Sequence, residues 1–409
     1  MSTSLEEYPL CLLPVAAYSH AAMHPLSRTT QLIEAGISAG QHIGAQLAIY
    51  HHHALIADYA TGLARPAVAE IGQNALPMTP DSLVIWMSAG KPITAIAIAQ
   101  LWEKGLLTLD DTIARHIPEF AAHGKQAITM RHILTHMAPL RLVDLRWPIE
   151  TWEQAIARIC AARPEPRFIA GKTAGYSMHA TWFILGEIIR RLAQLAPDTD
   201  DPTGLASYYR RQIFLPASMI DTHAALSPAQ QAHYADRLAI MQITEKHPAP
   251  PFPQGFDTPQ AMQQIRPSAS NRGPIRELAL FYESLARTLS GLSTQHPALL
   301  SPQAIEALTA RHRVHILDKT FNAIIDWGLG FIINSATYNN PLTPYQYGPH
   351  AGTRTFGHSG NQSSTAFHDP ENELTVALVF NGMPGESQHQ ARTREVLAAI
   401  YEDLELAPH

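Results

Sequence analysis

The feature that most constrains the fold of this 409-residue chain is one segment that is apolar on nearly every side. Residues 86–102 have the sequence WMSAGKPITAIAIAQLW, and the stretch from about 89 to 104 has the length and composition of a helix. A helix that is apolar all round cannot lie on a surface and must be enclosed by other elements. The rest of the chain must therefore cover this helix on every side.

The same segment carries a lysine, Lys91, three residues after Ser88. Burial of a charged ammonium group is energetically unfavourable, so a buried lysine favours its neutral amine form. Residues three apart share one face of a helix, so Ser88 and Lys91 can lie within reach of each other. Pro92 is tolerated only near a helix start, which places Ser88 at the N-terminal end. The unpaired backbone N–H groups at that end stabilise a developing negative charge. The pair suits a serine nucleophile with an amine as its base. A capping serine with a lysine that reaches water would give the same local pattern.

Composition limits the class of protein. Hydrophobic residues make up 46% and charged residues 16%, which indicates a globular chain. A net charge of −6 gives no basic surface for nucleic acid or anionic lipid. No uninterrupted apolar run reaches the ~20 residues that cross a bilayer.

Cysteine usage and the first residues bear on location. Cys11 and Cys160 lie far apart and form no disulfide framework. The chain starts with MSTSLEEYPLCLLPVAA, which has acidic residues where a secretory signal has basic ones. We therefore expect a cytoplasmic protein with no nucleic-acid partner and no membrane insertion. Its oligomeric state stays open.

Strand-like and helix-like segments follow in an order that predicts the architecture. A helix is expected over about 27–38, then a hairpin in GAQLAIYHHHALIADYATG (44–62). Helical periodicity dominates between about 111 and 305, and residues 247–259 (HPAPPFPQGFDTP) suggest a proline-rich surface loop. Strands return after about 323, with a turn at 369–372, and the chain closes with an amphipathic helix over 394–404.

This order predicts an α/β (α+β) fold. An antiparallel β-sheet flanked by helices would be built from both chain ends, residues 1–110 and 310–409, with an inserted all-α lobe, residues 111–309. Pockets favour the junction between two lobes, so the active site is expected there.

Three other patterns suggest sites but are assigned structural roles. GISAG (36–40) matches a Gly-x-Ser-x-Gly elbow, but a helix precedes it and a strand follows, the reverse of what that elbow requires. Residues 51–53 are three histidines, whose side chains alternate between strand faces and cannot converge on one ion. His132 and His136 lack the glutamate of His-Glu-x-x-His. We expect no metal and no other cofactor.

Three stretches, in this order, resemble one family. WMSAGK (86–91) resembles the Ser-x-x-Lys motif of the serine β-lactamase and penicillin-binding-protein superfamily. GYSMHATWFILGEIIRR (175–191) resembles the Tyr-x-Asn motif and following helix of its class C branch, and FGHSGN (356–361) the strand that carries Lys-Thr-Gly. The flanks ITMRHILTHMAPL and PSASNRGPIRELALFYESL agree, and the likeness covers roughly residues 30–400. It implies a β-lactamase/transpeptidase-like fold.

The resemblance also implies a role for each matching residue. Ser88 would be the acylated nucleophile, Lys91 the amine that activates it, and Tyr176 a phenol that shuttles protons, its ionised form favoured by the nearby ammonium. The oxyanion hole would use the backbone N–H groups of Ser88 and Asn361. The run His358, Ser359, Gly360 and Asn361 would line the substrate site.

Two residues depart from the family pattern. Met178 stands where the family usually has asparagine, so a side-chain amide that helps hold substrate and lysine is missing. His358 replaces the lysine of Lys-Thr-Gly, and a histidine that is largely neutral near pH 7 should capture a substrate carboxylate less well. The resulting His-Ser-Gly motif looks like that of esterases and amidases in this branch. Both departures argue against a cell-wall peptidase or a periplasmic lactamase.

The sequence thus predicts a serine hydrolase that cleaves carboxylic esters through an acyl-Ser88 intermediate, with a small-molecule ester or amide as substrate. Two alternatives stay open. One is acyl transfer from the same acyl-enzyme to an alcohol or amine. The other is a non-catalytic binding protein that retains the fold. The replacement of the usual asparagine by Met178 suggests this alternative.

Overall fold

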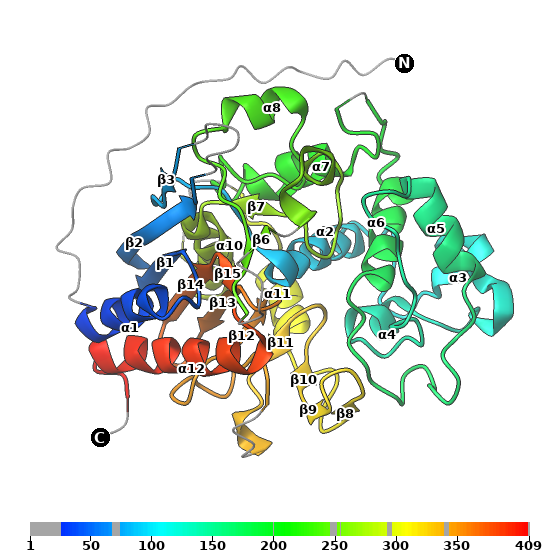
Figure 1. Ribbon diagram of the computed structural model, residues 1–409. Coiled ribbons are helices and arrows are strands. Elements are labelled where there is room, and N and C mark those ends of the chain that lie inside the picture. The colour runs from blue at the N-terminus through cyan, green and yellow to red at the C-terminus, as the bar shows by residue number, and fades with distance from the viewer. Residues whose placement is uncertain are drawn as a thin grey trace.

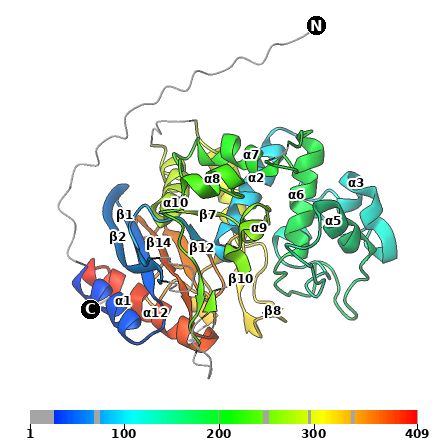
Figure 2. The ribbon, with the colours of Figure 1, turned by 45° about the horizontal axis from the view of Figure 1, so that its top comes forward.

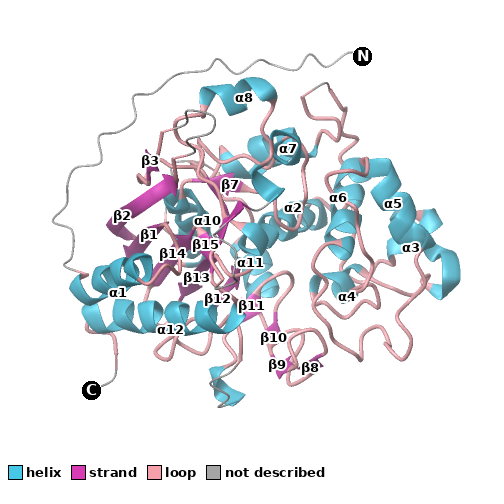
Figure 3. Ribbon diagram, viewed as in Figure 1, coloured by secondary structure: helices cyan, strands magenta, loops and turns pink. Residues whose placement is uncertain are grey.

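A computed structural model describes residues 26–67, 74–198, 200–245, 252–253, 255–292, 297–338 and 343–407. The strands gather on one side of the molecule, and α3 to α6 lie on the other (Figure 3). α2 runs between these two parts (Figure 1). This arrangement confirms the predicted α/β class.

The main sheet has eight strands, and every neighbouring pair is antiparallel. β1 pairs with β14, so both ends of the chain build one sheet, as predicted. The strands in spatial order are β10 (Asp326–Trp327), β11 (Ile332–Ile333), β12 (Phe356–Ser359), β13 (Ser364–Asp369), β14 (Leu374–Phe380), β1 (Gly44–His51), β2 (Ala54–Arg65) and β3 (Leu76–Pro77).

Helices cover both faces of this sheet. α1 (Ser27–Ser38) and α12 (Glu386–Asp403) lie side by side on one face, and α10 (Ile275–Leu289) packs against β1, β13 and β14 (Figure 1). Successive strand residues point to opposite faces. Leu47 and Ile49 therefore join the apolar cluster of α12, whereas Ala48 joins the cluster of α10. Burial on both faces explains why β14 is apolar except for Thr375.

The apolar segment forms α2 (Lys91–Glu103), in which every residue from Lys91 to Leu101 is buried. It contacts α6 (Ala180–Leu192), α11 (Pro302–Thr309) and β12, so it is enclosed as expected (Figure 2). The remaining α-helices are α3 (Ile113–His116), α4 (Met130–Leu134), α5 (Trp152–Ala161), α7 (Leu205–Tyr209), α8 (Pro228–His233) and α9 (Pro259–Met262). No helix in the described ranges has both the length and the apolar character needed to cross a bilayer.

The inserted segment is not purely helical, which corrects the expectation of an all-α lobe. β7 (Arg272–Gly273) pairs with β4 (Val84–Ile85), and β5 (Gln242–Ile243) pairs with β6 (Phe252–Pro253) and β15 (Gly382–Met383). Strands of two residues leave no periodic signal. α10 also lies within 111–309 yet packs on the sheet. The division into 1–110 with 310–409 and 111–309 stays a prediction.

Several local predictions can be compared with the described residues. α1 covers 27–38 as predicted and ends at Ser38, so GISAG is a helix terminus. The 44–62 hairpin is confirmed: His52 Nδ1 bonds Glu373, and His53 Nδ1 bonds Glu283 at 2.8 Å. The turn between β13 and β14 is also confirmed.

Two other predictions fall partly on residues that the structure does not describe. Of the expected loop 247–259, residues 247–251 and 254 lie outside the described ranges. Its described part is not simply a surface loop, because Phe252–Pro253 forms β6 and the Asp257 carboxylate is buried 3.2 Å from Arg272. Cys160 is buried with a free thiol, and Cys11 lies outside the described residues.

Candidate active site

Ser88 lies in a 3₁₀ turn, Met87–Gly90, that leads directly into α2. We call these four residues the Ser88 turn. Met87 adopts φ of +51°, a left-handed conformation that a non-glycine residue holds only at an energetic cost. Such a conformation persists only where the surrounding structure imposes it.

Neighbouring segments hold the Ser88 turn on both sides. The Trp86 N–H donates to the Asn271 carbonyl at 2.9 Å, and Asn271 Nδ2 donates to the Gly90 carbonyl at 3.1 Å. From the sheet, Ser364 Oγ donates to the Trp86 carbonyl at 2.6 Å. The turn is therefore fixed between the segment that leads into β7 and the start of β13.

Lys91 is fully buried, and its Nζ lies 3.0 Å from Ser88 Oγ. The same nitrogen donates to the carbonyl oxygens of Met178 at 3.0 Å and Ser268 at 3.1 Å. Burial lowers the pKa of Lys91 well below its usual value, and the nearby charge of Arg266 lowers it further. A neutral amine has two N–H bonds, which the two carbonyls accept. Its lone pair is then left for the Ser88 hydroxyl proton.

This arrangement also bears on Met178, which replaces the asparagine whose side-chain amide usually helps to hold the lysine. No side-chain amide is needed to hold Lys91, because the backbone carbonyls of Met178 and Ser268 do so. The Met178 side chain is itself 56% exposed and lines the pocket.

Tyr176 is buried beside Ser88 and Lys91. Its ring centroid lies 5.1 Å from Lys91 Nζ, and its phenol is hydrogen-bonded to the Ser88 side chain. The Tyr176 N–H donates to Asp318 Oδ1 at 3.1 Å, and its carbonyl accepts from Thr320 Oγ1 at 3.0 Å. The structure thus brings the serine, the amine and the phenol together.

The protonation state of Tyr176 differs from the expectation. Burial raises the pKa of Tyr176 above its usual value, and the hydrogen bond with Ser88 opposes this only in part. Burial also disfavours the charged form of Lys91, so the ammonium that would stabilise a phenolate is itself disfavoured. The expected ionised phenol is therefore wrong, and Tyr176 is a proton donor in the resting site.

His358 lies on β12 and lines the same pocket. Its Nδ1 is 2.8 Å from the Ser359 carbonyl, which can only accept, so Nδ1 carries the proton. Burial lowers the pKa of His358 to about 3, with a smaller contribution from Lys91. His358 is therefore neutral at pH 7, and its Nε2 presents a lone pair.

Two backbone N–H groups are available for an oxyanion. Ser88 is the second residue of its 3₁₀ turn, where an N–H has no carbonyl partner one turn earlier. On the strand side, the Gly360 N–H donates to the Ser364 carbonyl and the Ser363 N–H donates to the Gly360 carbonyl. Among the described residues, no acceptor takes the N–H of the intervening Asn361.

Ser88 opens into a pocket of about 530 Å³. Of the predicted site residues, Ser88, Tyr176, His358, Ser359 and Asn361 line it, while Lys91 lies buried behind Ser88. The other lining residues are Met87, Met178, His179, Phe256, Ala269, Thr320, Phe321, Ile332, Pro344, Tyr345, Glu386 and Gln390.

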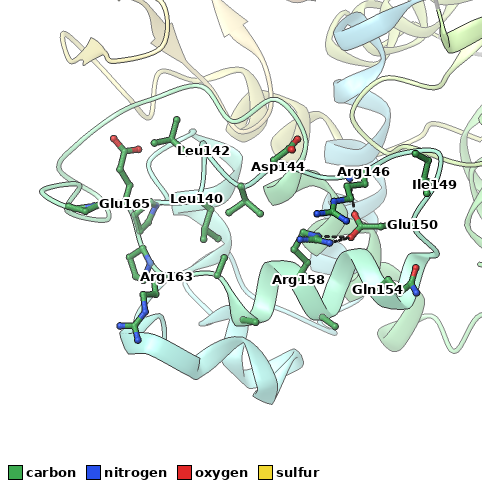
Figure 4. Close-up of a pocket in the computed structure, with 17 residues that line it drawn as sticks. Leu140, Leu142, Asp144, Arg146, Ile149, Glu150, Gln154, Arg158, Arg163 and Glu165 are labelled. Carbon is green, nitrogen blue, oxygen red and sulfur yellow. Dashed lines mark hydrogen bonds and ion pairs between the residues drawn. The ribbon is translucent and has the colours of Figure 1, made fainter.

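A larger cavity of about 1130 Å³ lies in the helical region, between α5 and the segments on either side of it (Figure 4). Glu150 pairs there with Arg158, and Glu165 with Arg141. Its lining holds no serine, threonine, cysteine, lysine, histidine or tyrosine among the described residues. It therefore offers no hydroxyl or thiol nucleophile and no amine, imidazole or phenol beside one, and we do not place the active site there.

The paired histidines of the α4 region have separate structural positions. His132 Nδ1 accepts from the Thr129 N–H at 3.2 Å at the start of α4. His136 is buried, accepts from the Ser177 N–H at 3.0 Å, and stacks on Tyr176 with ring centroids 4.5 Å apart. His136 thus supports the Tyr176 segment.

Several residues of the site could not be found by sequence reasoning. Ser268 acts through its backbone carbonyl, which carries no sequence signal. Phe256 comes from the expected surface loop, and Glu386 from the first turn of α12. Only the fold brings these segments to Ser88, so spacing along the chain does not predict them.

Comparisons with known proteins identify the family of the chain. The Beta-lactamase family model matches residues 29–400. The esterase/beta-lactamase LipL of Mycobacterium tuberculosis is 23% identical over 360 residues, 83% of this chain and 77% of LipL. A penicillin-binding protein homologue from Caulobacter crescentus superposes with a TM-score of 0.70 at 25% identity, covering 92% of this chain and 97% of that one. EstCE1, described as a hydrolase with promiscuous acyltransferase activity, gives 0.70 at 20% identity, covering 91% and 97%. Since the family model spans most of the chain, this protein belongs to the Beta-lactamase family.

Proposed function

We propose that the protein is a serine hydrolase that cleaves carboxylic esters through an acyl-Ser88 intermediate. One observation carries this proposal: the buried Lys91 amine, whose pKa burial lowers well below its usual value, lies 3.0 Å from the Ser88 hydroxyl and is held by two backbone carbonyls. A serine becomes a nucleophile when an adjacent base takes its proton. The LipL name includes esterase activity, which supports the same chemistry.

The first half-reaction follows from these positions. The Ser88 proton passes to Lys91 as Oγ attacks the ester carbonyl, and the negative oxygen is stabilised by the N–H groups of Ser88 and Asn361. Each such donor contributes ~3–4 kcal/mol to transition-state stabilisation in other acyl-transfer enzymes. The protonated Tyr176 then donates to the leaving alkoxide, which departs as the alcohol. Tyr176 recovers its proton from the Lys91 ammonium.

The second half-reaction reverses the proton path. Water enters the place of the alcohol and gives its proton to Lys91, with Tyr176 in contact. Its oxygen attacks the acyl carbon, the bond to Ser88 Oγ breaks, and Oγ takes up the proton. The carboxylic acid leaves, and Ser88, Lys91 and Tyr176 return to their starting states.

A serine-directed fluorophosphonate tests the nucleophile. We expect one adduct on the wild-type protein by intact mass, none on Ser88→Ala, and an unchanged adduct on Ser38→Ala at the end of α1. Lys91→Ala and Tyr176→Phe should each lower kcat/KM for a chromogenic ester by roughly 100-fold or more, because each removes a proton carrier. An adduct on Ser88→Ala equal to that on the wild type would overturn the assignment. No adduct on the wild type would favour the non-catalytic binding protein.

Acyl transfer is a second candidate, favoured by the activity described for EstCE1. An alcohol or amine acceptor would take the place of water in the second half-reaction. Product analysis with an activated ester and graded acceptor concentrations separates the two. Release of free acid at all acceptor concentrations supports hydrolysis, and acceptor-dependent ester or amide supports transfer. A cytoplasmic location stays a prediction from the sequence.

A further inference from the structure

The wall of the pocket formed by Phe321, Tyr345 and Glu386 has no role in the proton path. We propose that these three residues form a subsite for a cationic group on the substrate, such as a quaternary ammonium. This inference rests on the proposed function and narrows its substrate class to esters that carry a positive charge, with neutral esters as poorer substrates.

The charge of the pocket is the first argument. Among the described lining residues, Glu386 is the one with an aspartate, glutamate, lysine or arginine side chain. The two lining histidines are neutral at pH 7, because burial lowers the pKa of His179 well below its usual value and that of His358 to about 3. Lys91 lies behind Ser88 and is not part of the lining, and burial lowers its pKa well below the usual value. The pocket therefore carries a single negative charge.

The surroundings of Glu386 leave this charge available. Its carboxylate accepts from Tyr345 Oη at 3.0 Å and from Gln390 Nε2 at 2.8 Å, both neutral donors that orient it. In the described ranges, no lysine, arginine or histidine forms an ion pair with it. Arg392 on the same helix is buried, and its guanidinium donates to the backbone carbonyls of Gln41, Gln362 and Gly382.

Aromatic rings connect this carboxylate to the reacting serine. The ring centroids of Tyr176 and Phe321 lie 4.9 Å apart, and those of Phe321 and Tyr345 lie 5.4 Å apart. The Tyr345 hydroxyl then reaches Glu386. A cation is attracted by the face of an aromatic ring and by a carboxylate, and quaternary ammonium ligands are bound by such cages. One end of an ester held at Ser88 would thus meet a surface suited to a cation.

The same pocket is unsuited to a substrate carboxylate. The Nδ1–H of His358 is engaged by the Ser359 carbonyl, so Nε2 offers a lone pair and no donor. Arg266, whose guanidinium lies 5.4 Å from the centroid of the Phe256 ring, is 7% exposed and is not part of the lining. An anionic group would therefore meet the Glu386 charge without a compensating cation.

Binding to Ser88→Ala tests the subsite without turnover, so the result does not depend on the proposed reaction. We expect calorimetric titration to detect phenyltrimethylammonium binding, and benzoate binding at least about 5-fold more weakly. Glu386→Gln should weaken binding of the cation by about 3- to 10-fold, the range typical of exposed ion pairs and cation–π contacts. Glu395→Gln, which removes an exposed carboxylate from the same helix outside the pocket, should leave binding unchanged.

Turnover by the wild-type protein supplies the second readout. Acetylcholine and 3,3-dimethylbutyl acetate share their shape and differ in charge, so the ratio of their kcat/KM values isolates the effect of the cation. We expect a ratio above one that falls about 3- to 10-fold in Glu386→Gln and stays constant in Glu395→Gln. Absence of cation binding, equal binding of benzoate, or an unchanged affinity in Glu386→Gln would overturn the subsite. If the wild-type protein cleaves neither ester while Ser88→Ala still binds the cation, the hydrolase proposal would be overturned and the subsite would stand.

Discussion

At the scale of single residues, the environment of Lys91 bears on the proposed role of Ser88. The amine meets two carbonyl oxygens and one hydroxyl, and no carboxylate of the described residues forms an ion pair with it that would hold a proton on it. Arg266 adds a positive charge nearby. It is 7% exposed and stacks on Trp147 at 4.0 Å, with no ion-pair partner in the described part of the chain. Burial and this charge both lower the pKa of Lys91.

Replacement of Arg266 tests this electrostatic effect. The rate should rise with pH as Lys91 loses its proton, because only the free amine accepts the Ser88 proton. Arg266→Met removes a positive charge, raises the pKa of Lys91, and should move the acidic limb of the kcat/KM profile to higher pH. Arg266→Lys keeps the charge, and its limb should stay closer to that of the wild type. A limb that does not move, or moves to lower pH, in Arg266→Met would show that Arg266 does not act on Lys91.

At the scale of elements, the end of β12 must approach the Ser88 turn closely to bring two N–H donors together. Gly360 makes this approach possible: a Cβ there would lie 2.5 Å from the Trp86 carbonyl oxygen and 3.0 Å from Met87 Cβ. The Ser364 hydroxyl bridges the same gap with its bond to Trp86. The oxyanion site is therefore a contact between a strand and a turn, which neither forms alone.

Gly360→Ala should force the strand and the turn apart. We expect kcat to fall by roughly 10- to 100-fold, since a misplaced donor loses most of its effect on the oxyanion. The free energy of unfolding should fall by ~1–3 kcal/mol because of overpacking. Gly255→Ala is the control, because nothing lies within 4 Å of its added methyl group. Steady-state kinetics and urea unfolding measure both effects, and normal kcat in a folded Gly360→Ala would refute this account.

At the scale of the whole molecule, distant parts of the chain meet at Asp318. Its carboxylate forms a fully buried ion pair with Arg313 at 3.0 Å. Asp318 Oδ1 also accepts from the N–H groups of Tyr176, Thr320 and Phe321, at 3.1, 2.8 and 3.2 Å. One carboxylate thus fixes both a proton carrier of the site and a ring of the proposed cation subsite.

Asp318→Asn should therefore affect both stability and catalysis. It leaves the Arg313 charge buried without its partner, which costs ~3–5 kcal/mol of unfolding free energy. In the folded fraction at low temperature, kcat should fall while the fluorophosphonate adduct on Ser88 still forms, because Tyr176 is displaced and Ser88 is not. Asp236→Asn, at an exposed position, should change neither quantity. An Asp318→Asn protein with wild-type kcat and stability would contradict this role.

Local patterns predicted most of the regular elements. α1, the β1–β2 hairpin, α2 and the late strands follow from periodicity and turn residues, because these signals lie within one window of sequence. The two-residue strands β5, β6 and β7 were not predicted, because two residues are too few to show an alternating pattern. α10 was recognised as a helix, but its packing on the sheet depends on an apolar face that lies far away in the sequence.

The site divides in the same way. The Ser88–Lys91 spacing, the family motifs at Tyr176 and His358, and the burial of α2 were all available from the amino-acid order, because they depend on short-range geometry and composition. The carbonyls that hold Lys91, the protonation of Tyr176 and the charge of the pocket wall were decided only by tertiary structure. They depend on desolvation and on contacts between distant residues, such as those of Lys91 with Met178 and Ser268, 87 and 177 positions away, and both arise only when the chain is folded.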